Sequence, residues 1–123
     1  MKHSRASARV FGRYIIADWK PILFLVKGSK PNIAGDYFIH DVIESKPPDK
    51  TLNNWAQSTV EAQYLISKLT IDNQIVFDLI LGTGTTGIAA LKLKRQFLGM
   101  EKDVETFEDA KRNISKKITA TTE

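Results

Sequence analysis

The chain contains no cysteine among its 123 residues, which excludes a disulfide framework and a thiolate metal site. It also has no apolar run of the length that a membrane-spanning helix requires. The basic N-terminus is not followed by the long apolar segment of a secretory signal. These absences fit a cytoplasmic protein with no membrane partner, and the length allows one domain at most. We predict no metal site.

Acidic residues are scarce near the N-terminus. The first thirty residues carry seven Lys and Arg side chains against Asp18 alone, a net charge of +6, which leaves −2 for the remainder of a chain whose formal charge is +4. A basic end of this kind could contact the phosphates of a nucleic acid. A frayed, solvated terminus is the alternative for residues 1–10, and the sequence leaves both open.

The most informative stretch lies between Gln74 and Glu101. It contains an apolar run over 74–81, the sequence Gly-Thr-Gly-Thr-Thr-Gly over 82–87, a helical pattern over 88–94 and a second apolar run over 97–100. This order predicts a strand, a glycine loop, a helix and a second strand, which form a βαβ unit with a parallel sheet. The chain is therefore expected to have an α/β fold. Glycines allow the backbone to approach a ligand closely, and the helix directs free N–H groups toward it.

Three interpretations are open for the ligand of this unit. A P-loop is disfavoured because Gly87 is followed by Ile and Ala, where that loop requires Lys and then Ser or Thr. The spacing from Gly82 to Glu101 fits the fingerprint of a dinucleotide site. Asp78 argues against a dinucleotide, because its charge repels a pyrophosphate and attracts an ammonium or sulfonium group. S-adenosyl-L-methionine (SAM) carries both cations, so we favour SAM, with a βα turn that binds nothing as the remaining alternative.

The segment from Asp78 to Asp103 resembles the SAM-binding segment of DNA amino-methyltransferases of the N4-cytosine/N6-adenine class. In that family the segment reads Asp-Pro-Phe-x-Gly-Ser/Thr-Gly-Thr-Thr, then an Ala- and Leu-rich helix, then Arg-Arg-Phe-Ile-Gly-Ile-Glu-x-Asp. The resemblance is closest over 55–115 and looser over 14–54. It implies a partial SAM-dependent methyltransferase fold, which is Rossmann-like and three-layered with a mostly parallel sheet, and it implies SAM as the cofactor.

The resemblance also implies a set of cofactor contacts. Asp78 and the loop glycines would line the methionine end of SAM, and Glu101 would accept hydrogen bonds from two ribose hydroxyls. Polar residues just before the preceding helix hold the methionine end in the family. The predicted set is Gln57, Ser58, Asp78, Leu81, Gly82, Thr83, Gly84, Thr85, Thr86, Glu101 and Lys102.

The sequence departs from the family at the catalytic motif. The Asp-Pro-Pro-Tyr type of motif, which grips the target amine and stacks on the base, is not present; the one Pro-Pro pair, at 47–48, lacks both flanking groups. Leu79 and Ile80 also stand where the family has Pro-Phe. We therefore assign no catalytic residue. The chain is predicted to be the SAM-binding portion of a DNA adenine-N6 or cytosine-N4 methyltransferase, incomplete without a catalytic half. The alternative is a non-catalytic SAM- or nucleotide-binding or assembly module.

We expect four stretches along the chain: a basic irregular N-terminus at 1–13, an apolar strand and short recognition-like insert at 14–54, the SAM-binding part at 55–115 and a flexible tail at 116–123. The strand within the second stretch is Ile22–Val26, and a further short strand is expected at Asp36–Ile43. DNA would be a partner of the complete enzyme.

Three local signals are predicted around the helices. Ser58 and Glu61 predict a capping box at the start of a helix that runs to Leu69. Thr85 or Thr86 could cap the helix after the loop. Asp103 is the expected N-cap of the last helix, and Glu108 with Arg112 is an expected i,i+4 ion pair there.

The strand that ends at Asp78 has apolar residues on both faces, which suits a central strand. Without a catalytic half, one of its edges would be bare. We expect that edge to be covered either by Ile22–Val26 or by a second chain, which could be a second copy or the catalytic half.

Overall fold

The structure is a computed structural model that describes residues 8–9, 16–17, 21–28, 38–44 and 58–119. Backbone contacts divide the chain into two units, Met1–Asn32 and Ile33–Glu123. Within the described ranges, no helix is long and apolar enough to cross a membrane.

The first unit contains a short antiparallel pair of strands. β1 (Ala8–Arg9) pairs with β2 (Ile16–Ala17), with Ala8 opposite Ala17. The prediction of an irregular N-terminus is wrong at Ala8–Arg9. Two residues are too few to give a period-2 pattern, so sequence periodicity could not reveal this pair.

The predicted strand Ile22–Val26 is also wrong. These residues have no strand conformation, and their side chains are between 40% and 86% exposed. A strand needs a neighbour for its backbone N–H and C=O groups, and the described residues provide none for this run. Apolar composition alone was therefore not enough to predict a strand here.

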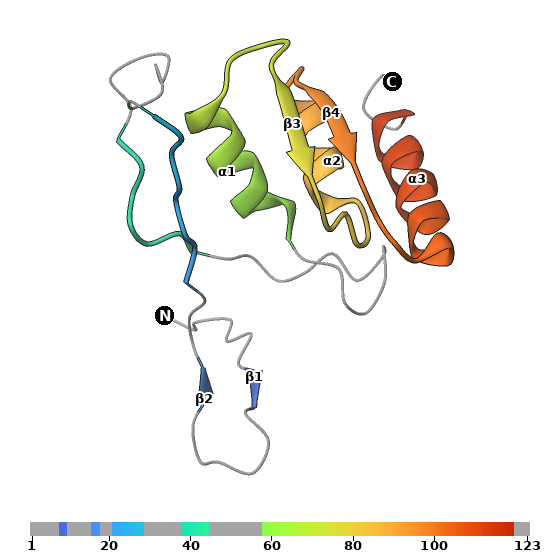
Figure 1. Cartoon of the computed structure of the whole chain (residues 1–123), viewed down its shortest axis with the longest axis horizontal. Coiled ribbons are helices and arrows are strands. Elements are labelled where there is room, and N and C mark those ends of the chain that lie inside the picture. Colours follow the sequence, from blue (N-terminus) through green and yellow to red (C-terminus); the bar gives the residue numbers. More distant parts are fainter. Residues whose placement is uncertain (1–7, 10–15, 18–20, 29–37, 45–57, 120–123) are drawn as a thin grey trace. The chain divides into compact units, whose positions relative to one another are not determined.

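The second unit contains the predicted βαβ arrangement. Its elements are, in order, α1 (Thr59–Leu69), β3 (Ile75–Asp78), α2 (Thr85–Lys92), β4 (Gln96–Gly99) and α3 (Val104–Thr119). β3 and β4 are parallel, with Ile75 paired to Gln96 and Asp78 to Gly99. Figure 1 shows the two strands side by side, with α2 behind them and α1 and α3 to either side.

α2 lies at the centre of this unit because its residues are small. Gly87, Ile88, Ala89 and Ala90 are all buried, and Ala89 and Ala90 form the core with Ile66 of α1. Val76 and Phe97 pack against this core from the two strands. The short side chains let α1, both strands and α3 approach α2 closely.

The helices cover one face of the sheet. Val76 and Phe97 are half-buried toward them, whereas Ile75, Phe77 and Leu98 on the opposite face keep 65%, 50% and 57% of their surface exposed. The described elements therefore form two layers of an α/β structure. The third layer that the resemblance implies stays a prediction.

The first helix begins as predicted but without the full capping box. The Ser58 hydroxyl accepts a hydrogen bond from the Val60 N–H at 3.1 Å, which satisfies one of the free donors of the first turn. Glu61 does not return a bond to the Ser58 N–H, and its buried Oε2 atom has no hydrogen-bond partner among the residues that the structure describes. Ser58 is thus a simple N-cap.

The predicted strand Asp36–Ile43 is wrong where it can be compared. Residues 36–37 lie outside the described residues, and Phe38–Ile43 are irregular, with Phe38 87% exposed. The His40 N–H donates to the Tyr64 hydroxyl at 2.9 Å. This backbone group is used by a side chain of α1 and not by a neighbouring strand.

The last helix is longer than predicted. Asp103 caps it by accepting from the Thr106 N–H at 2.8 Å, as expected, but the helix continues to Thr119, so the flexible tail is wrong over 116–119. Residues 120–123 lie outside the described residues. Lys116 and Lys117 favour the extension because positive charge stabilises a helix C-terminus.

The predicted ion pair of this helix is wrong in its partners. Arg112 bonds Asp109, and Lys111 bonds Glu108 at 3.0 Å. Both pairs have i,i+3 spacing, where the sequence analysis paired Glu108 with Arg112 at i,i+4.

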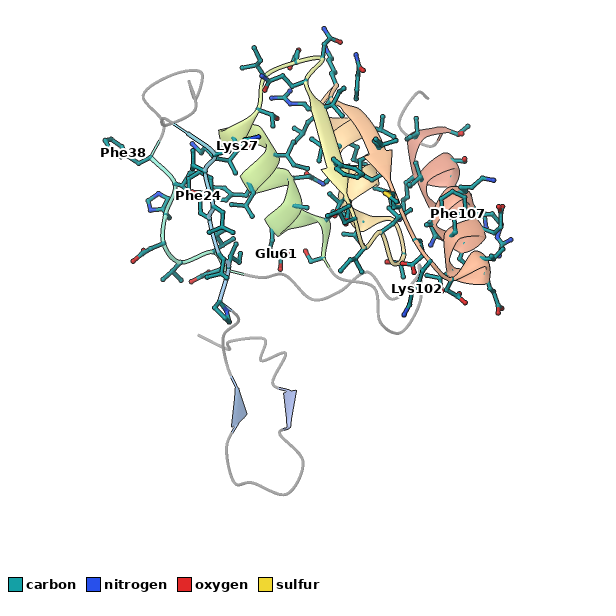
Figure 2. All side chains as sticks on the ribbon, in the orientation of Figure 1. Phe24, Lys27, Phe38, Glu61, Lys102 and Phe107 are labelled. Carbon is teal, nitrogen blue, oxygen red and sulfur yellow. The ribbon has the colours of Figure 1, made fainter. Side chains whose placement is uncertain are left out.

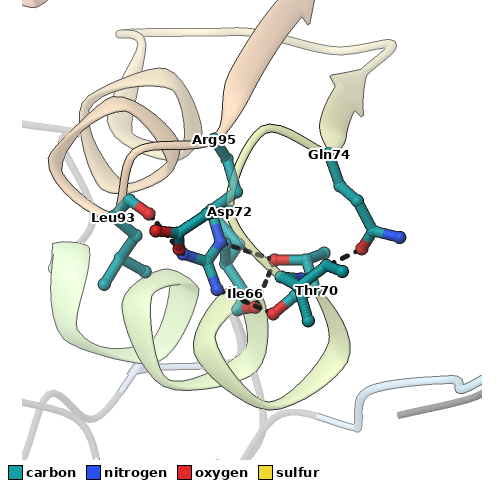
Figure 3. Close-up of polar contacts among 7 residues, drawn as sticks. Ile66, Thr70, Asp72, Gln74, Leu93 and Arg95 are labelled. Atoms are coloured by element: carbon teal, nitrogen blue, oxygen red, sulfur yellow. Dashed lines mark hydrogen bonds and ion pairs between the residues drawn. The ribbon is translucent and has the colours of Figure 1, made fainter. Parts of the chain in front are cut away.

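Arg95 joins the elements at the end of the unit where β3 and β4 begin (Figure 3). Its Nε donates to the Thr70 hydroxyl at 2.9 Å and its Nη2 to the Thr70 carbonyl at 2.7 Å. Nη1 bonds the Leu93 carbonyl and the Asp72 carboxylate. The arginine side chain is only 10% exposed, whereas that of Asp72 is 63% exposed. Arg95 therefore ties the end of α1 to the end of α2.

We expect Arg95→Lys to lower the free energy of unfolding by about 1–3 kcal/mol, because an ammonium cannot form the forked contacts and leaves the Thr70 carbonyl unsatisfied. Asp72→Ala should cost less than about 1 kcal/mol, because that carboxylate is exposed. Urea unfolding with Lys92→Ala as the control measures both. Equal losses for the two variants would show that the exposed ion pair, and not Thr70, carries the interaction.

Candidate functional site

The glycine loop follows β3 and is fixed at both of its ends by backbone hydrogen bonds. The Leu81 N–H donates to the Met100 carbonyl at 2.9 Å, and the Gly84 N–H returns to the Leu81 carbonyl at 3.0 Å. Gly82 and Gly84 have φ angles of +54° and +87°, which side chains with a Cβ adopt only at a cost. The loop therefore turns sharply where β3 meets α2.

The three loop glycines have different neighbours. A Cβ atom on Gly84 would lie 3.0 Å from the Ile114 side chain, and one on Gly87 would lie 2.7 Å from the ring of Phe97. A Cβ on Gly82 would meet no atom of the described residues within 4 Å. Gly84 and Gly87 thus permit close packing of α3 and β4, whereas the space beside Gly82 is open to a ligand.

The first turn of α2 leaves backbone donors free. α2 begins at Thr85 with Gly84 as its N-cap, and no side chain caps it. The prediction of Thr85 or Thr86 as the cap is therefore wrong, because both are already helical. The first helical bond runs from the Ile88 N–H to the Gly84 carbonyl at 3.0 Å, so the three preceding N–H groups have no partner within the helix.

Glu101 connects the end of β4 to the glycine loop. Its Oε2 accepts from the Gly82 N–H at 3.0 Å, and its Oε1 accepts from the Lys102 and Asp103 N–H groups at 2.9 and 3.2 Å. The N–H groups of Asp103 and Gly82, followed by that of Lys102, hold the pKa of the Glu101 carboxyl below its ordinary value of 4.5. Three backbone donors thus stabilise a carboxylate directly beside the loop.

Asp78 occupies the end of β3. Its Oδ1 accepts from the Ile80 N–H at 3.0 Å, and its backbone carbonyl accepts from the Met100 N–H at 2.8 Å. The side chain is half-buried. Both acidic residues therefore lie where the parallel strands end, which is where ligands bind in open α/β sheets.

The other predicted residues fall into three groups. Thr83 and Thr85 belong to the loop and the first turn of α2, with their hydroxyl oxygens 3.3 Å apart. Leu81 is 6% exposed and packs inward, so its side chain is part of the core. Lys102 is exposed, and Gln57 lies outside the described residues.

Ser58 precedes α1, whose first turn lies at the same end of the unit as the loop. Figure 2 shows Glu61 of that turn and Lys102 both at this end. Among the described residues, no group of His or acidic side chains is arranged to hold a metal ion.

Asn113 of α3 is a loop contact that the sequence analysis missed. Its Nδ2 donates to the Thr83 carbonyl at 3.1 Å across thirty residues of sequence. The sequence signal that could have revealed this contact was the spacing of Asn113 from its neighbours in the helix. Asn113 shares a helix face with Ala110 and Ile114, whose atoms would meet a Cβ on Gly84.

The lowered pKa of Glu101 predicts that the contribution of this carboxylate to the stability of the fold depends on pH. A carboxyl whose pKa is lower in the folded than in the unfolded state stabilises the fold above the unfolded pKa, and this stabilisation is lost as the pH falls through the folded value. We expect Glu101→Gln to unfold more easily than the wild type at neutral pH and to converge with it as the pH falls below about 4.5. Thermal melting from pH 7 to pH 3 measures this, and a constant difference at every pH would contradict it. Glu105→Gln is the control, because Glu105 is exposed in the first turn of α3.

Comparison with known proteins gives a consistent result. Residues 58–112 match the model of a DNA methylase family. The chain is 30% identical over 76 residues to the type II methyltransferase M2.LlaDCHI of Lactococcus lactis subsp. cremoris, covering 57% of this chain and 28% of that protein. It is 38% identical over 52 residues to the type II methyltransferase M.BglI of Bacillus subtilis, covering 42% of this chain and 15% of that protein.

Among solved structures, the complex of M1.HpyAVI with SAM matches 49% of this chain and 31% of its own, at 38% identity and a TM-score of 0.47. The match therefore spans less than a third of the length of each of these three relatives.

Proposed function

We propose that this chain is the SAM-binding part of a DNA adenine-N6 or cytosine-N4 methyltransferase. The match of residues 58–112 to the model of the N6/N4 DNA methylase family supports this proposal. The observation that carries the proposal is the bond between Glu101 and Gly82. It brings a carboxylate from the end of β4 against an open glycine at the end of β3.

The site fits SAM in its chemistry. The open side of Gly82 gives a flat ligand access to the backbone, and Glu101 is the carboxylate for the ribose hydroxyls. Asp78 supplies negative charge at the end of β3 for the cationic methionine portion. SAM, when bound, would supply an activated methyl group, and the residues of this chain would hold and orient it.

We assign the binding of the target base and of the DNA to a catalytic half, which lies on the same or on a separate polypeptide. The relatives M2.LlaDCHI and M.BglI extend well beyond the matched segment, and the catalytic motif is not present in this sequence. Methyl transfer to a base requires the base to be flipped out and its amine to be positioned in line with the methyl group. The residues described around the loop serve the cofactor.

The bare face of the sheet supports a contact with such a half. The large apolar side chains that β3, β4 and the residues directly after them leave between 50% and 82% exposed are Ile75, Phe77, Leu79, Ile80, Leu98 and Met100. Burial of these side chains against a partner would be favourable, because it removes apolar surface from water.

One edge of β3 is open as well. The Gln96 and Met100 N–H groups donate to the Gln74 and Asp78 carbonyls, so these two β3 residues face β4. Successive residues of a strand direct their backbone groups to opposite edges. The N–H and C=O groups of Ile75 and Phe77 therefore point to the other edge of β3. No described strand pairs there, and Ile22–Val26 has no strand conformation. The sequence analysis expected this edge to be covered either by Ile22–Val26 or by a second chain. We retain the second chain.

A second copy of the chain does not cover edge and face together. Pairing of two β3 edges about a two-fold axis places both bare faces on the same side, and stacking of two faces leaves both edges open. A catalytic half that adds a strand beside β3 and helices over the face covers both. It would also complete the three-layer fold that the resemblance implies.

The isolated chain is expected to bind SAM, and Glu101→Ala is expected to weaken binding by about 1.5–3 kcal/mol for each charge-assisted hydrogen bond that is lost. Asp78→Asn should weaken SAM more than its demethylated product, because only SAM carries the sulfonium charge. Calorimetry with SAM, the demethylated product and NAD measures all three affinities.

Glu105→Ala is the matched control for these measurements, because Glu105 is exposed at the start of α3. Wild-type affinity in Glu101→Ala would sink the ribose assignment, and tighter binding of NAD than of SAM would favour a dinucleotide site. If the folded wild type bound none of the three ligands, the alternative of a non-catalytic assembly module would replace the proposal.

The isolated chain is expected to transfer no methyl group to duplex DNA, because the residues that grip the base are not part of it. Incubation of the purified chain with labelled SAM and duplex DNA tests this.

The open edge of β3 is tested on the same sample by the amide exchange of Ile75 and Phe77. We expect both amides to exchange faster than that of Val76, which faces β4. Methylation by the chain alone would overturn the incomplete-enzyme proposal, and slow exchange at Ile75 and Phe77 in a monomer would show that the chain covers its own edge.

A further inference from the structure

The face of α3 toward the glycine loop is built from residues one helical turn apart. Atoms of Ala110 and Ile114 would lie 3.2 and 3.0 Å from a Cβ on Gly84, and between them in sequence Asn113 donates to the Thr83 carbonyl at 3.1 Å. Ala110 and Ile114 thus leave no room for a side chain at Gly84. The Asn113 hydrogen bond is the directional contact among the three.

This bond fixes the orientation of one peptide plane. The Thr83 carbonyl and the Gly84 N–H belong to the same planar unit. The carbonyl accepts from Asn113, and the N–H donates to the Leu81 carbonyl at 3.0 Å. A rotation of this plane would break both bonds, and Gly84, at φ +87°, has no side chain to resist the rotation.

The neighbouring part of the loop is held from the other side. The Gly82 N–H donates to Glu101 at the end of β4, while Thr83 is held from α3. Without the Asn113 bond, the peptide unit between the Gly82–Glu101 contact and the turn into α2 would be held only by the Gly84 N–H bond to the Leu81 carbonyl. Among the described residues, Asn113 is the one side chain that donates a hydrogen bond to the Thr83 carbonyl.

We propose that Asn113 is a positioning residue for the cofactor loop, which it acts on through the Thr83 carbonyl. The amide holds the Thr83–Gly84 peptide in the orientation that keeps Gly82 open and directs the first turn of α2 toward the ligand. The role extends the proposed function to a residue of α3 and, for its effect on affinity, rests on that function. Its effect on the loop itself does not require a ligand.

Two variants test the proposal by different routes. Asn113→Leu keeps the approximate size and removes the donor, and leucine favours a helix more than asparagine does. Asn113→Asp keeps the shape and replaces the donor by a second acceptor. Ser115→Ala, on the exposed side of α3, is the control. For each variant, thermal melting, amide exchange of Gly84 without ligand, and the affinities for SAM and its demethylated product are measured.

The expected result is faster Gly84 exchange in both Asn113 variants and a roughly three- to tenfold loss of affinity. The loss should be the same for SAM and for the demethylated product, because the loop does not distinguish the sulfonium charge. Asn113→Leu should melt close to the wild type, which separates positioning from a general loss of the fold.

Unchanged Gly84 exchange in both variants would overturn the proposal, and so would faster exchange with unchanged affinity, since the bond would then serve the fold alone. If the wild type bound neither ligand, the proposed function would fail by itself. Faster Gly84 exchange in that case would still support the hold of Asn113 on the loop.

Discussion

The close packing around α2 is the constraint on which the second unit depends. α2 contacts α1, α3 and both strands, and small side chains let packed elements approach closely. Gly87, Ala89 and Ala90 are the buried small residues of α2. The absence of a Cβ at Gly87 lets Phe97 and Ile114 approach from opposite elements. The same packing sets the position of the glycine loop, because α2 begins directly at its end.

The two ends of the βαβ unit are held by different chemistry. Where the strands begin, the arginine fork of Arg95 bonds carbonyl and hydroxyl groups at the ends of helices. Where they end, the carboxylate of Glu101 bonds backbone N–H groups. Each charge meets the backbone groups of opposite polarity that helix and strand ends leave unpaired. The cationic end is closed within the fold, whereas the anionic end borders the open side of Gly82.

Local signals in the sequence predicted the parts of this structure that depend on neighbouring residues. The order of strand, loop, helix and strand, the Ser58 cap and the Asp103 cap follow from short-range rules and are confirmed. Ile22–Val26 was wrong because a strand depends on a partner that composition cannot reveal. Asn113 was missed for a related reason. Its partner is a backbone carbonyl thirty residues away. The spacing of Asn113 from Ala110 and Ile114 places it on their face of the helix but does not identify that carbonyl.

The exposed sheet face has a consequence for the supply of this protein in a cell. A chain that presents apolar side chains such as Phe77 and Leu98 to water gains stability from any partner that binds only the folded form. If the proposed catalytic half is a separate polypeptide that covers this face, the half-life of this chain would depend on the ratio in which the two polypeptides are produced. Molecules of this chain made in excess would keep the apolar sheet face exposed, and chaperones and proteases recognise such surfaces. The amount of the complex would then be set by the scarcer polypeptide.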